Sequence, residues 1–146
     1  MTSSTQALIE ELKNDDFSLL IESGFVSVKQ LDEISAINIF NAAQVLSPKH
    51  TAPQSGLGFI ALNKLEVKKA TDIYAQILEA EPNNHLAKAF LGICYLLAKP
   101  TRKKGEAVIA EVLEETDEES IKNLCITCSE WAKKDLNKEK APPFFK

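Results

Sequence analysis

The chain has 146 residues, of which 45% are hydrophobic and 26% charged, with a formal net charge of -4 and a pI near 5.3. That length suits one ordinary domain that buries about 70% of its unfolded surface, and the composition excludes a disordered or fibrous chain. The acidic balance argues against nucleic acid as a partner, and no run approaches the ~20 apolar residues of a membrane span.

The chain begins MTSSTQALIEELKNDD, which lacks the basic start and apolar core of a secretory signal. We therefore expect a cytoplasmic protein, in which the odd number of three cysteines indicates reduced thiols rather than a disulfide framework. Residues 1–16 are expected to form an N-terminal extension that holds at most a short helix over 6–13.

One pattern then recurs three times with a period of 34 residues. Gly24, Gly58 and Gly92 are evenly spaced, and the later two lie in the similar octets SGLGFIAL and AFLGICYL. The period becomes 35 where one residue is inserted near Lys99. In each copy apolar residues recur at steps of three and four in two segments, which is the amphipathic helix period. The sequence therefore predicts three helix pairs, over residues 17–50, 51–84 and 85–119.

The repeated residue types indicate how the helices pack. A glycine in the first helix of a pair, and a small residue early in the second, let the two helices approach closely. We expect the close contacts from Gly58 and Gly92 and from the small residues Ala36, Ala70 and Gly105. A large residue one turn further along fills the space toward the next pair; these residues are Phe40, Tyr74 and Ile109.

The copies differ where their helices begin and end. In the first copy, FSLLIESGFVSVKQ predicts a helix that stops at Gly24 or becomes irregular beyond it, because the following residues are mediocre helix formers. Pro48 and Pro82 end the second helices of the first two copies. Thr116 and Glu119 read as a capping box that starts a last helix, over 120–137, and residues 138–146 form a flexible tail containing Pro-Pro-Phe-Phe.

The pattern of Leu-Gly, a small residue, an aromatic residue and a proline, at this period, resembles the tetratricopeptide repeat. Residues that carry the resemblance are Leu57, Gly58, Ala70, Tyr74 and Pro82, followed by Leu91, Gly92, Tyr95, Gly105 and Asp117. Gln54 and Lys88 depart from it, because the family commonly has a tryptophan there. The resemblance implies an all-α fold: a right-handed α-solenoid of three helix hairpins with a C-terminal capping helix, forming one domain over 17–137.

A chain that is little more than three such repeats and a capping helix, and is acidic, is also similar to the repeat chaperones of bacterial type III secretion systems. Residues 50–84 carry this similarity most strongly. It implies a cytoplasmic chaperone that binds a secreted needle or translocator subunit, with or without a second small chaperone, and prevents its premature self-association. Two alternatives stay open: a scaffold or adaptor that never releases its partner, and a homodimer in which the first copy or the tail fills a neighbour's groove.

The family resemblance places ligand-facing residues on the first helices of the pairs, where they line a concave groove. Carried over, they are Ala52, Ser55, Phe59, Leu62 and Asn63, then Leu86, Ala89, Ile93, Leu96 and Leu97. This trough is apolar and suits an apolar strand or amphipathic helix, and Asn63 alone could clamp a carboxylate. We expect Phe59, Leu62, Ile93 and Leu96 to matter most. Alternatively, some of the ten face the next helix, because a register taken from repeats can slip by one residue.

Other candidate sites are weaker. Cys125 and Cys128, with His50 and His85, have the residue types of a zinc site, but both cysteines lie on the apolar stripe of the last predicted helix. We expect them to pack as core residues, and we expect no metal or cofactor. The basic pairs and triplets at 68–69 and 102–104 read as solvated turns. No phosphate loop and no nucleophile with a histidine partner occurs, so we do not expect an enzyme.

Overall fold

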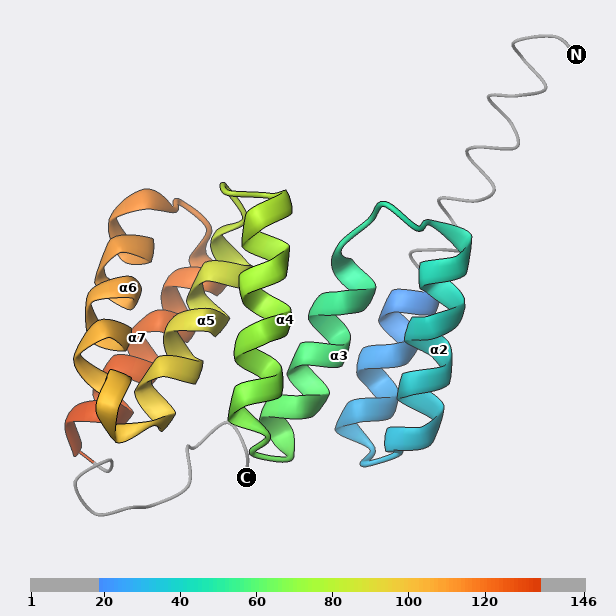
Figure 1. Cartoon of the computed structure of the whole chain (residues 1–146), viewed down its shortest axis with the longest axis horizontal. Coiled ribbons are helices and arrows are strands. Elements are labelled where there is room, and N and C mark those ends of the chain that lie inside the picture. The colour runs from blue at the N-terminus through green and yellow to red at the C-terminus, as the bar shows by residue number, and fades with distance from the viewer. Residues whose placement is uncertain (1–18, 135–146) are drawn as a thin grey trace, which may run out of the picture. The chain divides into compact units, whose positions relative to one another are not determined.

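The computed structural model describes residues 19–134, and in that part of the chain every regular element is helical (Figure 1). The predicted all-α class is confirmed. The helices are residues 19–29, α2 (Glu33–Leu46), α3 (Ala52–Asn63), α4 (Val67–Ala80), α5 (His85–Leu97), a short 3₁₀ helix η1 (Lys99–Thr101), α6 (Arg102–Glu115) and α7 (Glu119–Lys134). The helix predicted over 6–13, the tail and the end of the last predicted helix lie outside the described residues.

The described part of the chain divides into two compact units, and the boundary lies between residues 60 and 61. The division falls inside α3, so residues 52–60 belong to the first unit and 61–63 to the second. Each unit has its own hydrophobic core: one cluster in the first unit and two in the second.

Phe40 of α2 lies at the centre of the first unit's core, where it is fully buried. A Cβ atom added to Gly24 would lie 2.5 to 2.9 Å from atoms of the Phe40 ring, and one added to Gly56 would overlap the same ring. The ring of Phe25 meets Phe40 edge-on, with 5.1 Å between the ring centroids. Glycine therefore stands at both positions because the buried ring leaves no room for a side chain.

The expectation that the first helix stops or becomes irregular at Gly24 is wrong. Residues 19–29 form one continuous helix that passes through Gly24. Val28, one turn further along, is buried in the same cluster as Phe40, and Phe25 packs against that cluster. Burial of this apolar face outweighs the poor helix propensity of the segment, which for a glycine is about 1 kcal/mol relative to alanine.

Two turns that lie 34 residues apart have the same backbone conformation. Leu31 and Leu65 adopt left-handed φ values of 61° and 58°. The N–H of Leu31 donates to Val28 at 3.0 Å and that of Asp32 to Ser27 at 2.9 Å, and the turn at Leu65 repeats both bonds. This pattern is a Schellman ending, which usually has glycine at the left-handed position, because a side chain there costs about 1 kcal/mol or more.

The corresponding turn of the third copy is different. The 3₁₀ helix η1 connects α5 to α6, and the Thr101 hydroxyl donates to the Tyr95 carbonyl at 2.8 Å. This is where the sequence places the one-residue insertion. The extra residue is thus accommodated by a short turn of tighter helix, and the helices on either side are kept.

The second helices of the first two copies end alike. α2 ends at Leu46 and α4 at Ala80, each two residues before a proline. The next residue in each case leaves the helical conformation, with ψ near 80°, and its N–H closes the last helical hydrogen bond, from Ser47 to Ala43 at 2.9 Å and from Glu81 to Ile77 at 2.8 Å. Pro48 and Pro82 therefore mark helix ends as predicted.

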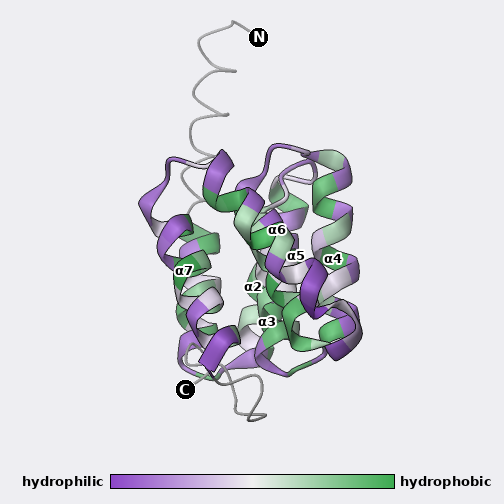
Figure 2. Cartoon of the chain, turned by 90° about the vertical axis from the view of Figure 1, so that its left-hand side faces the viewer, coloured by the Kyte–Doolittle hydropathy of each residue, from purple (hydrophilic) through white to green (hydrophobic). Residues whose placement is uncertain are grey.

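In the second unit α5 is the central helix and contacts α4, α6 and α7 (Figure 1). On the α4 side, the ring of Tyr74 stacks on Phe90 with 5.1 Å between centroids. On the other side, a second cluster joins α5, α6 and α7 around Leu96, Ile109 and Trp131. Hydrophilic residues gather in the turns and at the helix ends of this unit (Figure 2). None of the helices between residues 19 and 134 has the length and apolar character that a membrane span requires.

Helices α5 and α6 approach through two glycines, as predicted. A Cβ atom on Gly105 would lie 2.7 Å from the carbonyl oxygen of Gly92 and 2.7 Å from the backbone nitrogen of Leu96. A Cβ atom on Gly92 would lie 2.8 Å from Cγ1 of Ile109. At Gly105 the obstacle is backbone, so the two helices can be this close only without a side chain there.

A last helix does follow the third copy, but the predicted capping box at its start is wrong. α7 begins at Glu119, and the carbonyl of Glu118 accepts its first helical bond, from Lys122 at 3.0 Å. The buried Thr116 hydroxyl instead accepts from the N–H of Glu118 at 3.2 Å. This local turn satisfies a buried polar side chain two residues ahead of the cap.

Candidate binding surfaces

The ten residues predicted to line a groove lie on two helices. Ala52, Ser55 and Phe59 are in the part of α3 that belongs to the first unit, and Leu62 and Asn63 are in the part that belongs to the second. The remaining five, Leu86, Ala89, Ile93, Leu96 and Leu97, are on α5. Their exposure to solvent separates them into two groups.

Four of the ten are core residues, which corrects the prediction of an exposed groove at these positions. Leu62, Ile93 and Leu96 are 0% exposed and Ala89 is 1% exposed. Leu62 lies in the cluster with Tyr74, and the other three lie in the cluster formed with α6 and α7. The physical reason differs between the two clusters: α7 packs against α5 and α6 and takes Ala89, Ile93 and Leu96 into the core, whereas Leu62 is buried against residues of α4 and α5. The alternative that some of the ten face a neighbouring helix therefore holds for these four.

The other six are accessible to different degrees. Leu86 is 41% exposed at the start of α5, and Asn63 is exposed at the end of α3. Ala52, Ser55, Phe59 and Leu97 are half-buried. Phe59 packs within the first unit, where its ring lies 6.0 Å from that of Phe25. Leu86 and Leu97 are separated by three helical turns on α5, so they lie on nearly the same side of it.

A cavity between α6 and α7 is an apolar surface that the sequence did not reveal. Its volume is about 460 Å³, and its apolar lining comes from Leu96, Ile109, Ala110, Leu113 and Ile126. Glu106, Glu130 and Lys133 supply charged groups to the lining. The one signal in the sequence is Ile126, which lies off the buried stripe of α7 and is 46% exposed. A large apolar side chain left in water beside an apolar hollow is typical of a contact site.

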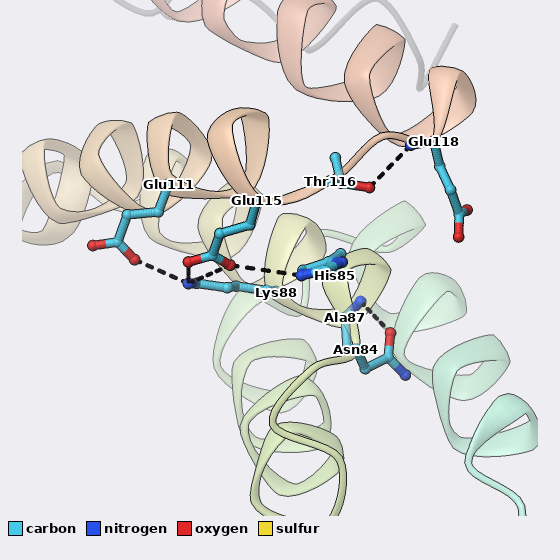
Figure 3. Close-up of polar contacts among 8 residues, drawn as sticks. All are labelled: Asn84, His85, Ala87, Lys88, Glu111, Glu115, Thr116 and Glu118. Atoms are coloured by element: carbon cyan, nitrogen blue, oxygen red, sulfur yellow. Dashed lines mark hydrogen bonds and ion pairs between the residues drawn. The ribbon is translucent and has the colours of Figure 1, made fainter.

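Lys88 stands where the repeat family commonly has tryptophan, and it connects α5 to α6 by charge (Figure 3). Its Nζ lies 3.0 Å from Oε2 of Glu111 and 3.0 Å from Oε1 of Glu115, and His85 Nε2 lies 3.7 Å from Glu115. Burial lowers the pKa of Lys88, but the hydrogen bonds to Glu115 and Glu111 outweigh it, so this pKa is raised above its ordinary value. The bridge thus joins α5 and α6 by an ionic contact.

The start of α5 beside this bridge is capped by Asn84. Its Oδ1 accepts from the N–H of Ala87 at 3.0 Å (Figure 3). Its Nδ2 donates to Glu81 at 3.0 Å. One side chain thus satisfies a free N–H of α5 and holds the turn that follows α4. The helix that carries Leu86 is fixed at its first turn.

The cysteines are buried in the second unit, as expected for core residues. Burial raises the pKa of Cys94 to about 11 and that of Cys128 to about 12, and it also raises the pKa of Cys125. Because the thiolate is the reactive form, these thiols are unreactive at neutral pH. Within residues 19–134 no group of three or more His, Cys, Asp or Glu is arranged to hold a metal ion.

Three polar residues near the starts of helices, His50, Arg102 and Lys104, make specific contacts. His50 Nδ1 accepts from the N–H of Ala52 at 3.2 Å and so caps the start of α3. Arg102 Nε donates to the Leu96 carbonyl at 3.2 Å, and Lys104 Nζ lies 4.6 Å from the centre of the Tyr95 ring. Arg102 is half-buried, so the expectation of a solvated side chain is wrong there, whereas His50, Lys104, Lys68 and Lys69 are exposed.

Comparison with known proteins gives no family assignment. No protein-family model matches the sequence, and no curated protein is significantly similar to it.

Proposed function

We propose that this chain is a binding protein built from tetratricopeptide-like helix hairpins arranged as a right-handed solenoid, and that it acts as a cytoplasmic chaperone of a type III secretion system. Its partner is a secreted needle or translocator subunit, which associates with other copies of itself through apolar helical surface. The chaperone covers an apolar segment of that subunit before export. A preformed surface does this with less ordering cost than a flexible one.

The observation that carries the proposal is a contact that recurs with the sequence period. Phe40 packs on Gly56 in the first unit, and Tyr74 stacks on Phe90 in the second. Each partner lies 34 residues from its counterpart, as do the left-handed turns at Leu31 and Leu65. Repeated helix pairs that contact their neighbours in the same way are typical of proteins that bind partners on extended surfaces.

The accessible members of the predicted groove are the proposed contact residues. Within the second unit, Leu86 and Leu97 on α5 supply apolar anchors, and the exposed amide of Asn63 supplies a polar one. The buried residues Ile93 and Leu96 act indirectly, because they hold α5 against α6 and α7. A charge at Leu96 is therefore expected to disrupt the fold of the second unit rather than remove a contact with the partner.

The test compares two exposed apolar residues of similar accessibility. The chain is co-expressed with the small helical protein encoded beside its gene, and co-purification and solubility of that protein are measured. Leu86→Glu, at a residue 41% exposed, is expected to abolish co-purification, and the control Ile126→Glu, at one 46% exposed, is expected to retain it. Both variants should keep the helical circular dichroism of the unaltered chain. Failure of the unaltered chain to co-purify with this protein contradicts the proposal.

A second candidate function is that of a scaffold or adaptor, and the cavity between α6 and α7 favours it. This cavity is a separate apolar surface with Glu106, Glu130 and Lys133 in its lining, so it could hold a different partner from the groove. An adaptor of this kind retains its partners and does not release them for export. Loss of co-purification with Ile126→Glu, and not with Leu86→Glu, would place the partner in the cavity.

A further inference from the structure

The solvent-facing stripe of α2 is uncharged. Ile34, Asn38, Asn41 and Val45 are all exposed, with Ile34 76% and Val45 81% exposed. Residues at steps of four, three and four lie along one side of an α-helix. The only charged residue of α2 is Glu33 in its first turn, so the stripe presents isoleucine and valine at its ends and two amides between them.

The chain itself shows what its repeats place on this surface elsewhere. At the positions equivalent to Ile34 and Val45, α4 has Lys68 and Glu79, and α6 has Lys103 and Glu114, all of them exposed. Branched side chains such as isoleucine and valine are no better as helix formers than lysine or glutamate. In water they therefore bring no advantage at these positions. The α2 stripe has an apolar residue at each end, where the other two copies have a lysine and a glutamate. This difference indicates that a binding partner covers the stripe.

We propose that α2 of a second copy of this chain covers this stripe, in a two-fold antiparallel contact. The order of residue types supports this occupant, because a branched apolar residue, two asparagines and a branched apolar residue, at spacings of four, three and four, give the same pattern from either end. An axis between residues 39 and 40 places Ile34 opposite Val45 of the second copy and Asn38 opposite Asn41. Such self-complementarity is what a two-fold interface requires.

The chemistry of the stripe fits the same occupant. Each asparagine amide has both donors and an acceptor, so Asn38 of one copy and Asn41 of the other can satisfy each other, and the axis generates the same pair a second time; these pairs fix the register. The stripe has no charge with which to attract a charged partner. Leu31, 91% exposed just before α2, and Pro48 just after it extend the apolar ends by the same symmetry.

The contact is expected to be weak. One face of a helix of 14 residues is far smaller than the roughly 800 Å² per partner of a standard interface. We expect a dissociation constant of roughly 10 to 1000 µM, so that the monomer predominates in dilute solution. The contact does not depend on the proposed function, since none of the proposed partner-binding residues lies on α2.

The experiment is sedimentation equilibrium of the full chain from about 5 µM to about 1 mM. The weight-average mass of the unaltered chain is expected to rise from 16.1 kDa toward twice that value. The double variant Ile34→Lys/Val45→Lys places like charges opposite each other across the axis and should stay monomeric. Ile34→Lys/Val45→Glu places opposite charges there and should recover part of the association. Gln76→Lys, on the exposed side of α4, is the control and should behave as the unaltered chain.

An unaltered chain that stays at 16.1 kDa throughout overturns the two-fold contact and leaves the stripe to another protein or to another segment of this chain. Equal association of the two double variants also overturns it, because the antiparallel pairing requires them to differ. A measurement without substitutions guards against a variant that fails to fold: amide chemical shifts of the unaltered chain should change with concentration along α2. Changes confined to α5 or α7 would contradict the proposal.

Discussion

The two units keep their helices close in different ways, although both are made of the same repeat. In the first unit a single large ring, Phe40, fills the space above Gly24 and Gly56. In the second, the backbone of α5 meets Gly105 of α6 directly, with no side chain between them. The first contact depends on one side chain and the second on two backbones. The close approach of helices thus rests on a buried side chain in one unit and on backbone atoms in the other.

Removal of the Phe40 ring is expected to have the largest effect, because this ring is fully buried at the centre of the first unit's core. Phe40→Ala should lower the free energy of unfolding by about 3 to 5 kcal/mol, since it leaves a cavity bounded by glycines that cannot fill it. Urea unfolding followed by circular dichroism measures the loss. Phe25→Ala is the matched control, because Phe25 is only half-buried against the same ring and should cost less. Equal losses for the two variants would mean that Phe40 is not the centre of the contact.

Gly105→Ala is expected to have the next largest effect, and it tests the backbone contact of the second unit. The added methyl group would meet backbone atoms of Gly92 and Leu96, which cannot rotate away, so the helices must separate. Overpacking of this kind costs about 1 to 3 kcal/mol, less the gain of up to ~1 kcal/mol in helix propensity. Thermal unfolding should show the loss.

Gly92→Ala is the control for that substitution, because its methyl group would meet a side chain, that of Ile109, which has rotamers available. It should be less destabilising than Gly105→Ala. The reverse order would show that side-chain packing, and not the approach of the two backbones, limits the distance between α5 and α6.

The period in the sequence was enough to predict the helix pairs, the helix ends before Pro48 and Pro82, and the location of the inserted residue near Lys99. These features depend on local spacing and on residues with strong backbone preferences. The sequence failed at Gly24 because intrinsic propensity says nothing of the ring of Phe40 that packs over it. Tertiary contact decided that helix.

The candidate site was predicted less well than the fold, for a related reason. Which residues of α5 stay accessible depends on where α7 packs, and neither the repeat period nor the resemblance determines this. Ile93 and Leu96 are therefore core residues, and Leu86 is accessible. The cavity between α6 and α7 depends on the same packing, so the sequence alone does not indicate that Ile126 lines a cavity.

The smallest effect is expected at Lys88, whose ionic bridge supplements the glycine contact between α5 and α6. A double-mutant cycle with Lys88→Ala and Glu115→Ala should give a coupling free energy of about 0.5 to 1 kcal/mol at low ionic strength, because both groups are partly exposed.

Salt at about 1 M should reduce this coupling by screening. Since the folded pKa of Lys88 is raised, the coupling should be fully present from neutral pH up to the ordinary lysine pKa of 10.5 and be lost as the pH rises through the raised pKa of the folded state. The more exposed pair Lys64 and Glu66, 3.3 Å apart in the same unit, serves as control and should show weaker coupling. A coupling at Lys88 as large as the cost of Gly105→Ala would reverse the comparison, because the second unit would then be held by charge rather than by the contact between its backbones.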